Sequence, residues 1–321
     1  MKLYKRVIPV LLAMLLLSGT AFAAGSIDLN HDVNVTVSYH DGDTPLVGAK
    51  FDIYLVASTD ESGNLTAADA FRRYNVDLRG KDAEAWEALA ATLEGYVLRD
   101  NIAPTDGGKT DAEGYLYLPS SGAKLTPGLY LMLGQRHMQG GRRYDAMPFM
   151  LMLPAQDAES GEYVYGVIVN PKHESSEIPD TPSAVTRKVL KVWDDAGKEN
   201  VRPAEVSVQL LRDGRVYDTV ALNAGNNWRY TWSDLDDSYS WTVVEQECED
   251  YTVRIERNGI TFVITNTYVK ETPDNPTPTE PTKPGLPQTG QPWWPVPLLL
   301  TCGLLFLVVG LICRKRYGDG T

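Results

Sequence analysis

Apolar and polar residues alternate along much of the first half of the chain, and this pattern predicts half-buried β-strands. The alternation is clearest at 33–37 (VNVTV) and 51–55 (FDIYL), because successive side chains of a strand point to opposite faces. Comparable apolar runs occur at 115–118, 129–133, 149–153 and 163–169. Turns that contain Asp and Gly or Pro-Gly separate several of these runs. The pattern therefore predicts a β-sandwich over residues 24–172.

One segment has helical rather than strand periodicity. Within 81–98, apolar side chains recur at intervals of three or four residues: Trp86, Leu89, Leu93 and Val97. Asp82 precedes this run and is placed to cap a helix. We expect a helix that is inserted between strands and covers the sandwich, and nothing in this apolar stripe indicates a ligand site.

The second half of the chain predicts another β-sandwich, over residues 185–269. Short apolar runs such as 206–211 are followed by turn residues, a pattern typical of sandwiches built from many short strands. Residues 173–184 (HESSEIPDTPSA) are polar and predict an interdomain linker, while residues 270–285 are rich in Pro and Thr and favour extended polyproline-II structure. The predicted fold class is all-β, with two Ig-like sandwich domains in tandem.

The first 23 residues have the composition of a secretory signal peptide. Three basic residues within the first six precede an apolar stretch at 7–17, and small residues follow at Ala21 and Ala23. We expect cleavage between Ala23 and Ala24, so the mature protein works outside the cell.

A second apolar run lies near the C-terminus, at 293–313, and the basic cluster 314–316 follows it. A run of about 20 apolar residues can cross a bilayer, and the basic cluster holds its end on the cytoplasmic side. We expect a transmembrane helix that holds the exported protein at the membrane.

Charge narrows the range of partners. The chain has 30 Lys+Arg and 42 Asp+Glu; the two processed ends hold six of the basic residues and one acidic residue, which leaves 24 against 41, a net charge of −17. A surface this acidic repels nucleic acid and anionic membranes, so we expect neither as a partner.

Cysteine usage leaves the exported body without an internal disulfide. Cys302 and Cys313 lie in the C-terminal apolar run, so Cys248 has no partner in the rest of the chain. Exported proteins are often held together by covalent cross-links. This chain either uses a different cross-link or has none.

Three polar residues of the second domain occupy positions where strand periodicity places apolar side chains. Lys191, Glu245 and Asn266 each share a strand face with apolar neighbours two residues away. Burying a charge is costly unless it is paired or neutralised. One interpretation is a buried Lys–Glu ion pair that is hydrogen-bonded to the amide.

The other interpretation is that these three buried residues react with one another. Burial lowers the pKa of a lysine and raises the pKa of a glutamate, so a neutral Lys191 can attack the side-chain carbonyl of Asn266. Glu245 then transfers protons and polarises that carbonyl. Ammonia leaves, and a Lys191–Asn266 isopeptide bond joins the first and last strands of the domain.

The second domain resembles the collagen-binding-protein B-type (CnaB-like) domain throughout. The resemblance is carried by KVWDD, RPAEVSVQLLRDG, NNWRYTW, WTVVEQ and FVITNTY. In that family the matching lysine, glutamate and asparagine form an intramolecular isopeptide bond. The resemblance therefore implies a bond between Lys191 and Asn266, with Glu245 as its catalytic acid/base.

A pentapeptide precedes the C-terminal apolar run: Leu286, Pro287, Gln288, Thr289 and Gly290. With the run and the basic tail that follow it, the pentapeptide resembles the LPXTG cell-wall sorting signal of Gram-positive surface proteins. The resemblance implies that a sortase, class C-like or housekeeping, cuts between Thr289 and Gly290 and passes Thr289 to an amine of peptidoglycan or of a neighbouring pilin subunit. Residues 270–285 would then carry the domains through the wall. The alternative is an ordinary membrane anchor.

The first domain is similar to the N-terminal domains of Gram-positive pilins, through PLVGAKFDIYLVA, TDAEGYLYLP and TPGLYLML. Ser38 and Gly134 stand where the bond-forming lysine and glutamate would be, which leaves Asn170 without partners. We expect no isopeptide bond of this type in residues 24–172.

Residues 163–172 (YVYGVIVNPK) resemble the pilin motif of backbone pilins, with Tyr163 in place of the usual Trp and Asn170 in place of the usual Tyr. Pro171 should end the strand and present Lys172 beside the linker. The resemblance implies that Lys172 attacks the acyl-enzyme that holds another subunit's Thr289. Head-to-tail linkage of this kind builds a fibre. The alternative is a solvated linker lysine.

No other feature predicts further chemistry. The four histidines have no metal-ligand spacing, and the sequence shows no nucleophile–histidine pair or phosphate-binding loop. We expect no metal, no cofactor and no enzymatic activity beyond self-modification. The predicted function is a wall-anchored, shaft-type subunit of a sortase-assembled pilus, linked through Lys172 and Thr289. The alternative is a monomeric or pilus-associated adhesin that binds a host or matrix ligand.

Overall fold

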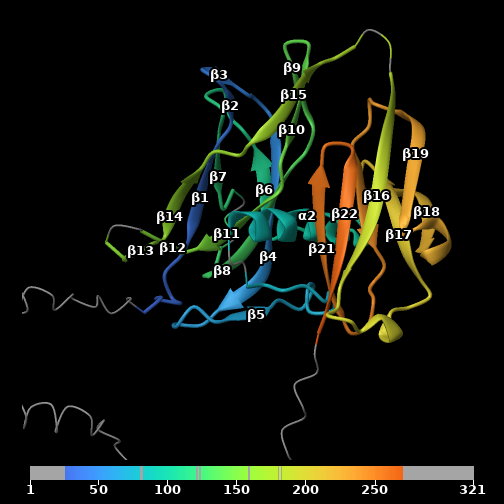
Figure 1. Cartoon of the computed structure of the whole chain (residues 1–321). Coiled ribbons are helices and arrows are strands. Elements are labelled where there is room, and N and C mark those ends of the chain that lie inside the picture. The colour runs from blue at the N-terminus through green and yellow to red at the C-terminus, as the bar shows by residue number, and fades with distance from the viewer. Residues whose placement is uncertain are drawn as a thin grey trace, which may run out of the picture. The chain divides into compact units, whose positions relative to one another are not determined.

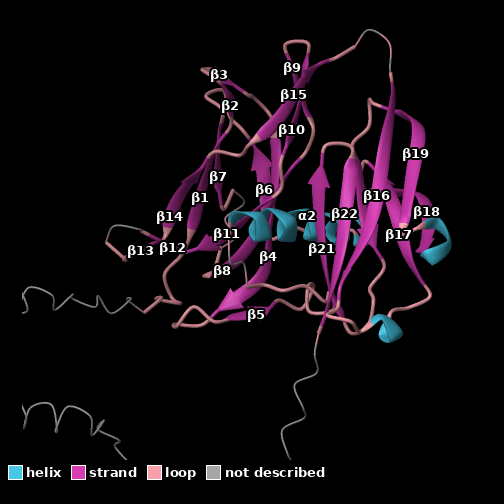
Figure 2. Cartoon of the chain, in the orientation of Figure 1, coloured by secondary structure: helices cyan, strands magenta, loops and turns pink. Residues whose placement is uncertain are grey.

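Strands make up most of the chain that the computed structural model describes, which is residues 26–79, 82–120, 122, 124–157, 160–179, 181 and 183–269 (Figure 2). We call residues 26–179 the N-module and residues 183–269 the C-module. The β-rich character predicted from the sequence is confirmed. The signal peptide with Ala23 and Ala24, the segment 270–285 and the sorting signal at 286–321 lie outside the described residues. No helix among the described residues is both long and apolar enough to cross a membrane.

The elements of the N-module are β1 (Asn34–Ser38), β2 (His40–Asp41), β3 (Thr44–Pro45), β4 (Lys50–Thr59), β5 (Leu65–Ala67), α2 (Ala83–Asp100), β6 (Asp106–Lys109), β7 (Tyr115–Leu118), β8 (Gly128–Gly134), β9 (His137–Gln139), β10 (Arg142–Ala146), β11 (Phe149–Leu153), β12 (Ala155–Gln156), β13 (Tyr163–Val164), β14 (Gly166–Val169) and β15 (His173–Glu177). Those of the C-module are β16 (Ala184–Asp194), the 3₁₀ turn η1 (Glu199–Val201), β17 (Glu205–Arg212), β18 (Arg215–Asn223), the 3₁₀ turn η2 (Ala224–Asn226), β19 (Arg229–Asp236), β20 (Trp241–Glu245), β21 (Tyr251–Asn258) and β22 (Thr261–Tyr268).

Two sheets of the N-module enclose its main core. One has the strand order β14-β1-β7, and the other has the order β11-β8-β4-β5, with β6 also paired to β4 (Figure 1). Alternate side chains fill the space between them, such as Val35 and Val37 from β1 and Ile53 from β4. The alternation at 33–37 and 51–55 therefore predicted both strands, but the expectation that 51–55 is half-buried is wrong, because β4 is buried on both faces.

Helix α2 covers the other face of this second sheet. Leu93 and Tyr96 of the helix pack with Val56 of β4 and Leu131 of β8 in a second core cluster. β4 and β8 are both buried on two faces, and β8 accordingly reads as a continuous apolar run, whereas β4 still contains the buried Asp52. Asp82 caps the helix as predicted, and its Oδ1 accepts a hydrogen bond from the Ala85 N–H at 2.8 Å. The prediction of a helix that covers the sandwich is confirmed.

The helix also packs against the C-module, a contact that local periodicity does not predict. Leu211 of β17 and Val244 of β20 belong to the same core cluster as α2. Thr92, buried in the helix, accepts a hydrogen bond from the backbone N–H of Ile255 in β21 at 2.7 Å. The two modules are therefore joined by a shared core and belong to one compact unit.

The segment 173–184, expected to be a linker, instead begins with a strand. β15 runs antiparallel to β10, and the His173 ring packs edge-to-face against Tyr39 and Tyr144, with ring centroids 5.3 and 5.4 Å away. An edge strand is held by backbone hydrogen bonds and can carry polar side chains. The polar composition of this segment therefore concealed the strand.

The C-module is a second sandwich, in which the sheet β19-β16-β22-β21 faces the sheet β18-β17-β20. Its core includes Trp232 and Ile264 from the first sheet and Val208 and Val243 from the second. β16 and β22, the first and last strands of the module, lie side by side and parallel. A single bond between them would therefore tie together the two ends of the module.

Candidate isopeptide and acceptor-lysine sites

The structure brings Lys191, Glu245 and Asn266 together from three strands and both sheets of the C-module. Trp193 of β16 lies opposite Asn266 of β22, and Lys191 is on the same face of β16 as Trp193 because strand side chains alternate. Lys191 and Asn266 are thus diagonal neighbours on one sheet face. Glu245 is the last residue of β20 in the facing sheet.

Glu245 contacts both other residues. Its Oε2 lies 3.5 Å from Lys191 Nζ, and its Oε1 accepts a hydrogen bond from Asn266 Nδ2 at 2.6 Å. Lys191 Nζ also lies 3.3 Å from the Val192 carbonyl oxygen and 3.4 Å from the Ile264 carbonyl oxygen. The carboxylate therefore links the amine to the amide.

The site is closed to water, and its electrostatics follow from that burial. The exposed fractions of Lys191, Glu245 and Asn266 are 3%, 0% and 0%. Burial lowers the pKa of Lys191 to about 8, although the charge of Glu245 opposes that shift. Burial likewise raises the pKa of Glu245, and Lys191 partly offsets it. Both shifts favour a neutral amine beside a protonated acid, which is the state that bond formation needs.

Two further observations concern the reacting atoms. Asn266 Oδ1 is buried and accepts no hydrogen bond within the described residues, an arrangement that is costly in a finished core. Lys191 Nζ lies 4.3 Å from the centroid of the Trp193 ring, and Trp193 packs edge-to-face on Trp228 and Tyr251 at 5.2 and 5.0 Å. This aromatic group covers the amine and keeps water from competing with it as a nucleophile.

The arrangement can perform one self-modification. If Lys191 Nζ bonds to Asn266 Cγ, the Cγ–Nδ2 bond breaks and Nδ2 leaves as ammonia. Glu245 is already hydrogen-bonded to Nδ2, the leaving atom, and is next to the attacking amine. It is therefore placed to take the proton from the amine and deliver it to the leaving nitrogen.

Cys248 lies in the loop after β20 and is the free cysteine among the described residues. Burial raises the pKa of its thiol, with Glu245 as a further cause. A protonated thiol is a poor nucleophile. Cys248 is therefore not expected to compete with Lys191.

Lys172 lies between β14 and β15 with its amine in solvent. Its side chain is 78% exposed, and Nζ is 3.4 Å from Oε1 of Glu87 on α2. Pro171 is buried and follows the end of β14, and the Lys172 carbonyl accepts a hydrogen bond from the Met147 N–H at 2.8 Å. As the motif predicted, the strand ends before Pro171. The backbone at Lys172 is held by this hydrogen bond, while the amine lies in solvent beside Glu87.

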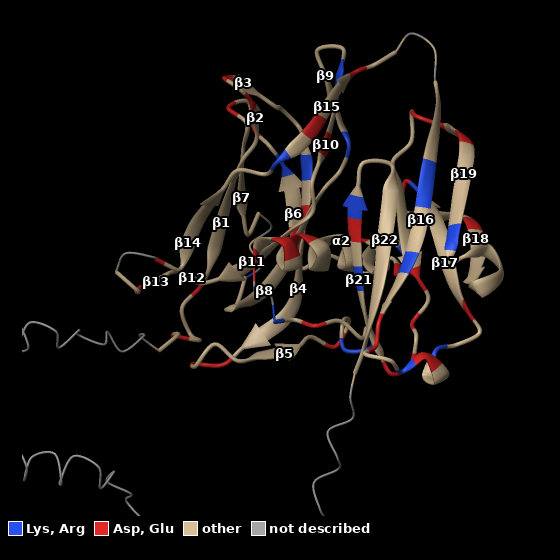
Figure 3. Cartoon of the chain, viewed as in Figure 1, with Lys and Arg blue, Asp and Glu red and all other residues tan. Residues whose placement is uncertain are grey.

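A cleft of about 990 Å³ opens beside Lys172. Its wall carries both signs of charge and some apolar surface: Glu84, Glu87 and Glu94 on α2, the basic residues Arg136, Arg143, Arg187 and Arg257, and the apolar residues Met147 and Phe149. Figure 3 shows acidic residues on α2. Sequence reasoning missed this cleft, because its walls come from segments that are far apart in the chain.

Glu94 gives the cleft a pH-dependent contribution to stability. Burial raises its pKa from 4.5 to about 7; Asp145 adds to the shift and Arg257 opposes it. In the unfolded chain the pKa of the Glu94 carboxyl has its ordinary value. The contribution of this group to the stability of the fold is therefore fully present below about pH 4.5 and is lost as the pH rises through about 7. We expect the free energy of unfolding to fall by about 1–2 kcal/mol from pH 5 to pH 8 through this group. Urea unfolding at both pH values should show a smaller fall in Glu94→Gln, and an equal fall in both proteins would contradict the assignment.

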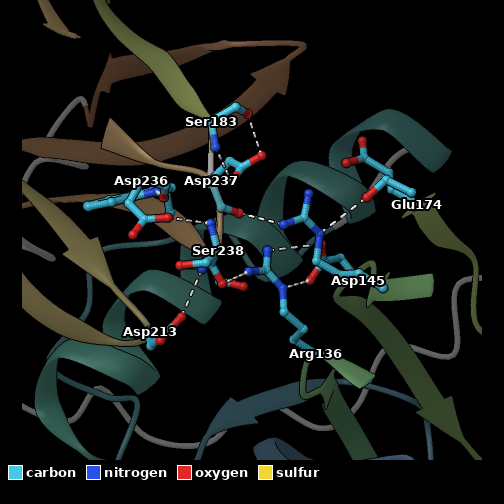
Figure 4. A network of polar contacts seen from close by, with 12 residues as sticks. Arg136, Asp145, Glu174, Ser183, Asp213, Asp236, Asp237 and Ser238 are labelled. Atoms are coloured by element: carbon cyan, nitrogen blue, oxygen red, sulfur yellow. Dashed lines mark hydrogen bonds and ion pairs between the residues drawn. The ribbon is translucent and has the colours of Figure 1, made fainter. Parts of the chain in front are cut away.

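Two arginines of the N-module hold a turn of the C-module (Figure 4). Arg136 donates to Asp145 at 2.6 and 3.0 Å and to the Ser238 carbonyl at 2.6 Å, and Arg143 donates to the Asp237 carbonyl. Asp237 in turn accepts hydrogen bonds from Ser183 at 2.6 and 3.2 Å, which lower its pKa. These contacts fix the chain where it enters the C-module.

The family of the C-module follows from comparison with known proteins. Residues 187–267 match the model of the Cna protein B-type domain. The C-module is a Cna protein B-type domain. Lys191, Glu245 and Asn266 all lie within this B-type domain, and Lys172 lies before it.

Sequence and structure comparisons match part of the chain to surface proteins of Gram-positive bacteria. The collagen adhesin of Staphylococcus aureus is 31% identical over 118 residues, which is 34% of this chain and 10% of the adhesin. Among solved structures, a single B repeat unit of the collagen binding surface protein of Staphylococcus aureus is 17% identical and covers 75% of this chain and 99% of its own, with a TM-score of 0.27. The shaft pilin SpaA of Lactobacillus rhamnosus GG is 16% identical over 76% of this chain and 100% of its own, with a TM-score of 0.26. TM-scores this low carry no argument about this chain.

Proposed function

We propose that this chain is a cell-wall-anchored structural subunit that a sortase joins head to tail, through Lys172 of one copy and Thr289 of the next. The observation that carries the proposal is the state of Lys172, an exposed amine on a hydrogen-bonded segment between β14 and β15. A sortase delivers an acyl group to such an amine: the Thr289–Gly290 bond breaks, and the Thr289 carboxyl carbon bonds to Nζ. The order of sorting pentapeptide, apolar run and basic tail supports the same proposal.

We also propose that the Lys191–Asn266 isopeptide bond cross-links the B-type domain. The three buried residues are in contact, and the pKa shifts of Lys191 and Glu245 favour the reactive state. Such a bond would supply the covalent cross-link that a disulfide provides in other exported proteins, since the described residues contain one free cysteine, Cys248. The cross-link and the polymer are independent claims and are tested separately.

The alternative function is a wall-anchored adhesin. The local identity to a collagen adhesin supports it, although the matched part is a small fraction of that protein. In this case Thr289 would be joined to peptidoglycan, and Lys172 would have no covalent role.

Replacing Lys172 distinguishes the two functions. We expect wall extracts of the producing cell to show a ladder of high-mass products that Lys172→Arg abolishes, because arginine keeps the charge beside Glu87 but is not a nucleophile under these conditions. Lys124→Arg is the matched control, since Lys124 is an exposed lysine in an ion pair with Asp32. A wild-type protein without a ladder, or a ladder that persists in Lys172→Arg, would contradict the polymer and favour the adhesin.

A further inference from the structure

An ion pair lies next to the aromatic group that covers Lys191. Strand alternation places Lys191 and Trp193 on the same face of β16, and Asp195 follows directly after the strand with a side chain that is 3% exposed. Arg202, which follows the 3₁₀ turn η1, donates two hydrogen bonds to the Asp195 carboxylate, at 2.5 and 2.9 Å. Bidentate pairing of this kind fixes the plane of the guanidinium as well as its position.

The guanidinium of Arg202 also contacts Trp193. Its Cζ lies 5.7 Å from the centroid of the Trp193 ring, inside the limit of about 6 Å for a cation–π contact. Lys191 Nζ lies 4.3 Å from the same centroid. Trp193 is half-buried, whereas Lys191 is 3% exposed. The ring is therefore part of the surface that separates the amine from solvent, and Arg202 is in contact with that ring.

The Asp195–Arg202 pair stays ionised at neutral and alkaline pH. Hydrogen bonding to Arg202 lowers the pKa of the Asp195 carboxyl, and the same contact raises the pKa of Arg202. Because neither group changes charge in this range, the contact between Arg202 and Trp193 does not depend on pH there.

The reactivity of the amine depends on its burial. Burial lowers the pKa of Lys191 to about 8, and Glu245 and Cys248 oppose that shift. Tyr251, which packs on Trp193, has a raised pKa and stays protonated at neutral pH. Entry of water would return the pKa of Lys191 toward its usual value and reduce the neutral fraction that can act as a nucleophile.

We propose that Asp195 and Arg202 are positioning residues for isopeptide formation, which hold Trp193 over Lys191 and so keep the amine dry and neutral. The proposal rests on the proposed Lys191–Asn266 bond. The two residues act through Trp193, and Glu245 remains the group that transfers the proton.

Competitive acetylation of the full chain tests this role. Asn266→Ala removes the electrophile, so Lys191 keeps a free amine beside Glu245. Trace labelling with acetic anhydride from about pH 6 to about pH 11, followed by peptide mass spectrometry, gives the rate and the titration midpoint of Lys191. Lys188, an exposed lysine of the same strand, is the internal reference.

We expect Lys191 to react at least about tenfold more slowly than Lys188 because it is covered, with a midpoint at the pKa of about 8. Adding Arg202→Gln should raise the labelling rate of Lys191 at high pH by about tenfold, because the cover opens to the reagent. The midpoint should move up toward 10.5, the ordinary pKa of a lysine, because water enters.

Two further variants separate positioning from a general loss of structure. Arg202→Lys keeps the charge beside Asp195 but loses the planar bidentate contact, so its midpoint should lie between those of Arg202 and Arg202→Gln. Arg212→Gln removes another cation–π contact of the same domain, with Tyr239 at 4.6 Å, and should change neither quantity. An unchanged rate and midpoint in Arg202→Gln, or the same change in Arg212→Gln, would overturn the inference.

The rate of bond formation gives the second measurement. Chains with Asn266 intact, recovered unfolded from inclusion bodies and then refolded, should lose ammonia at pH 7 at least about tenfold more slowly with Arg202→Gln than with Arg202, and the difference should shrink at about pH 10, where more of the amine is neutral. A wild type that never loses ammonia would reject the bond, and the role of the pair with it. A wild type that loses ammonia, with no effect of Arg202→Gln on labelling, would reject the positioning role alone.

Discussion

Wild-type protein is expected to weigh about 17 Da less than its processed sequence, the mass of one ammonia released by the bond-forming chemistry, whereas Glu245→Gln should have its full sequence mass. Glutamine has nearly the same size and can still accept the hydrogen bond from Asn266, but it cannot transfer the proton from the amine. A buried Lys–Glu ion pair, the alternative left open by the sequence, would give no mass difference in either protein. Intact-mass spectrometry decides between them.

The same substitution should lower thermal stability strongly. A bond between Lys191 and Asn266 closes a loop of about 75 residues, which in the chain-entropy model stabilises the fold by about 4 kcal/mol. Loss of the bond should therefore lower Tm by about 10 °C, with a further loss because Lys191 stays buried without a counter-ion.

Glu205→Gln is the matched control for this experiment, because Glu205 is an exposed glutamate of β17 in the same domain. It should retain the mass loss of 17 Da expected for ammonia and the wild-type Tm. A Glu245→Gln protein that still shows the mass loss would exclude Glu245 as the acid/base, and a wild type at full mass would exclude the bond.

Gly95→Val is expected to separate the two modules. A Cβ at Gly95 would lie 2.9 Å from the Val243 carbonyl oxygen and 3.1 Å from Val244 Cβ, so α2 can approach β20 only without a side chain there. Overpacking at such a site costs about 1–3 kcal/mol, and movement of the helix would also expose Leu211 and Val244, which are fully buried in the shared core.

Urea unfolding should show this separation directly. We expect one cooperative transition for wild type, because the modules share a core, and two resolved transitions with a lower first midpoint for Gly95→Val. Ala83→Val introduces the same side chain at an exposed position of the same helix and should leave a single transition. If both variants unfolded alike, the contact between α2 and β20 would not be what holds the modules together.

Most of the strand pattern and the buried polar set could be predicted from the sequence, because both depend on local periodicity. Lys191, Glu245 and Asn266 stood out as polar residues on apolar faces, and the structure places them in contact. The helix and its Asp82 cap were predicted for the same reason. Strand β15 was missed because an edge strand is defined by its backbone partner, β10, and not by its own side chains.

The sequence by itself determined the faces of most strands and singled out the candidate bond-forming residues, and it predicts the terminal signals and the pilin-like motif at Lys172. These features can be recognised from residues that lie close together in the chain. Only the tertiary structure decided that α2 is shared between the modules and that Lys172 stands at a cleft beside Glu87. Those features depend on contacts between residues that are far apart in the chain, and local periodicity carries no information about which distant surfaces meet.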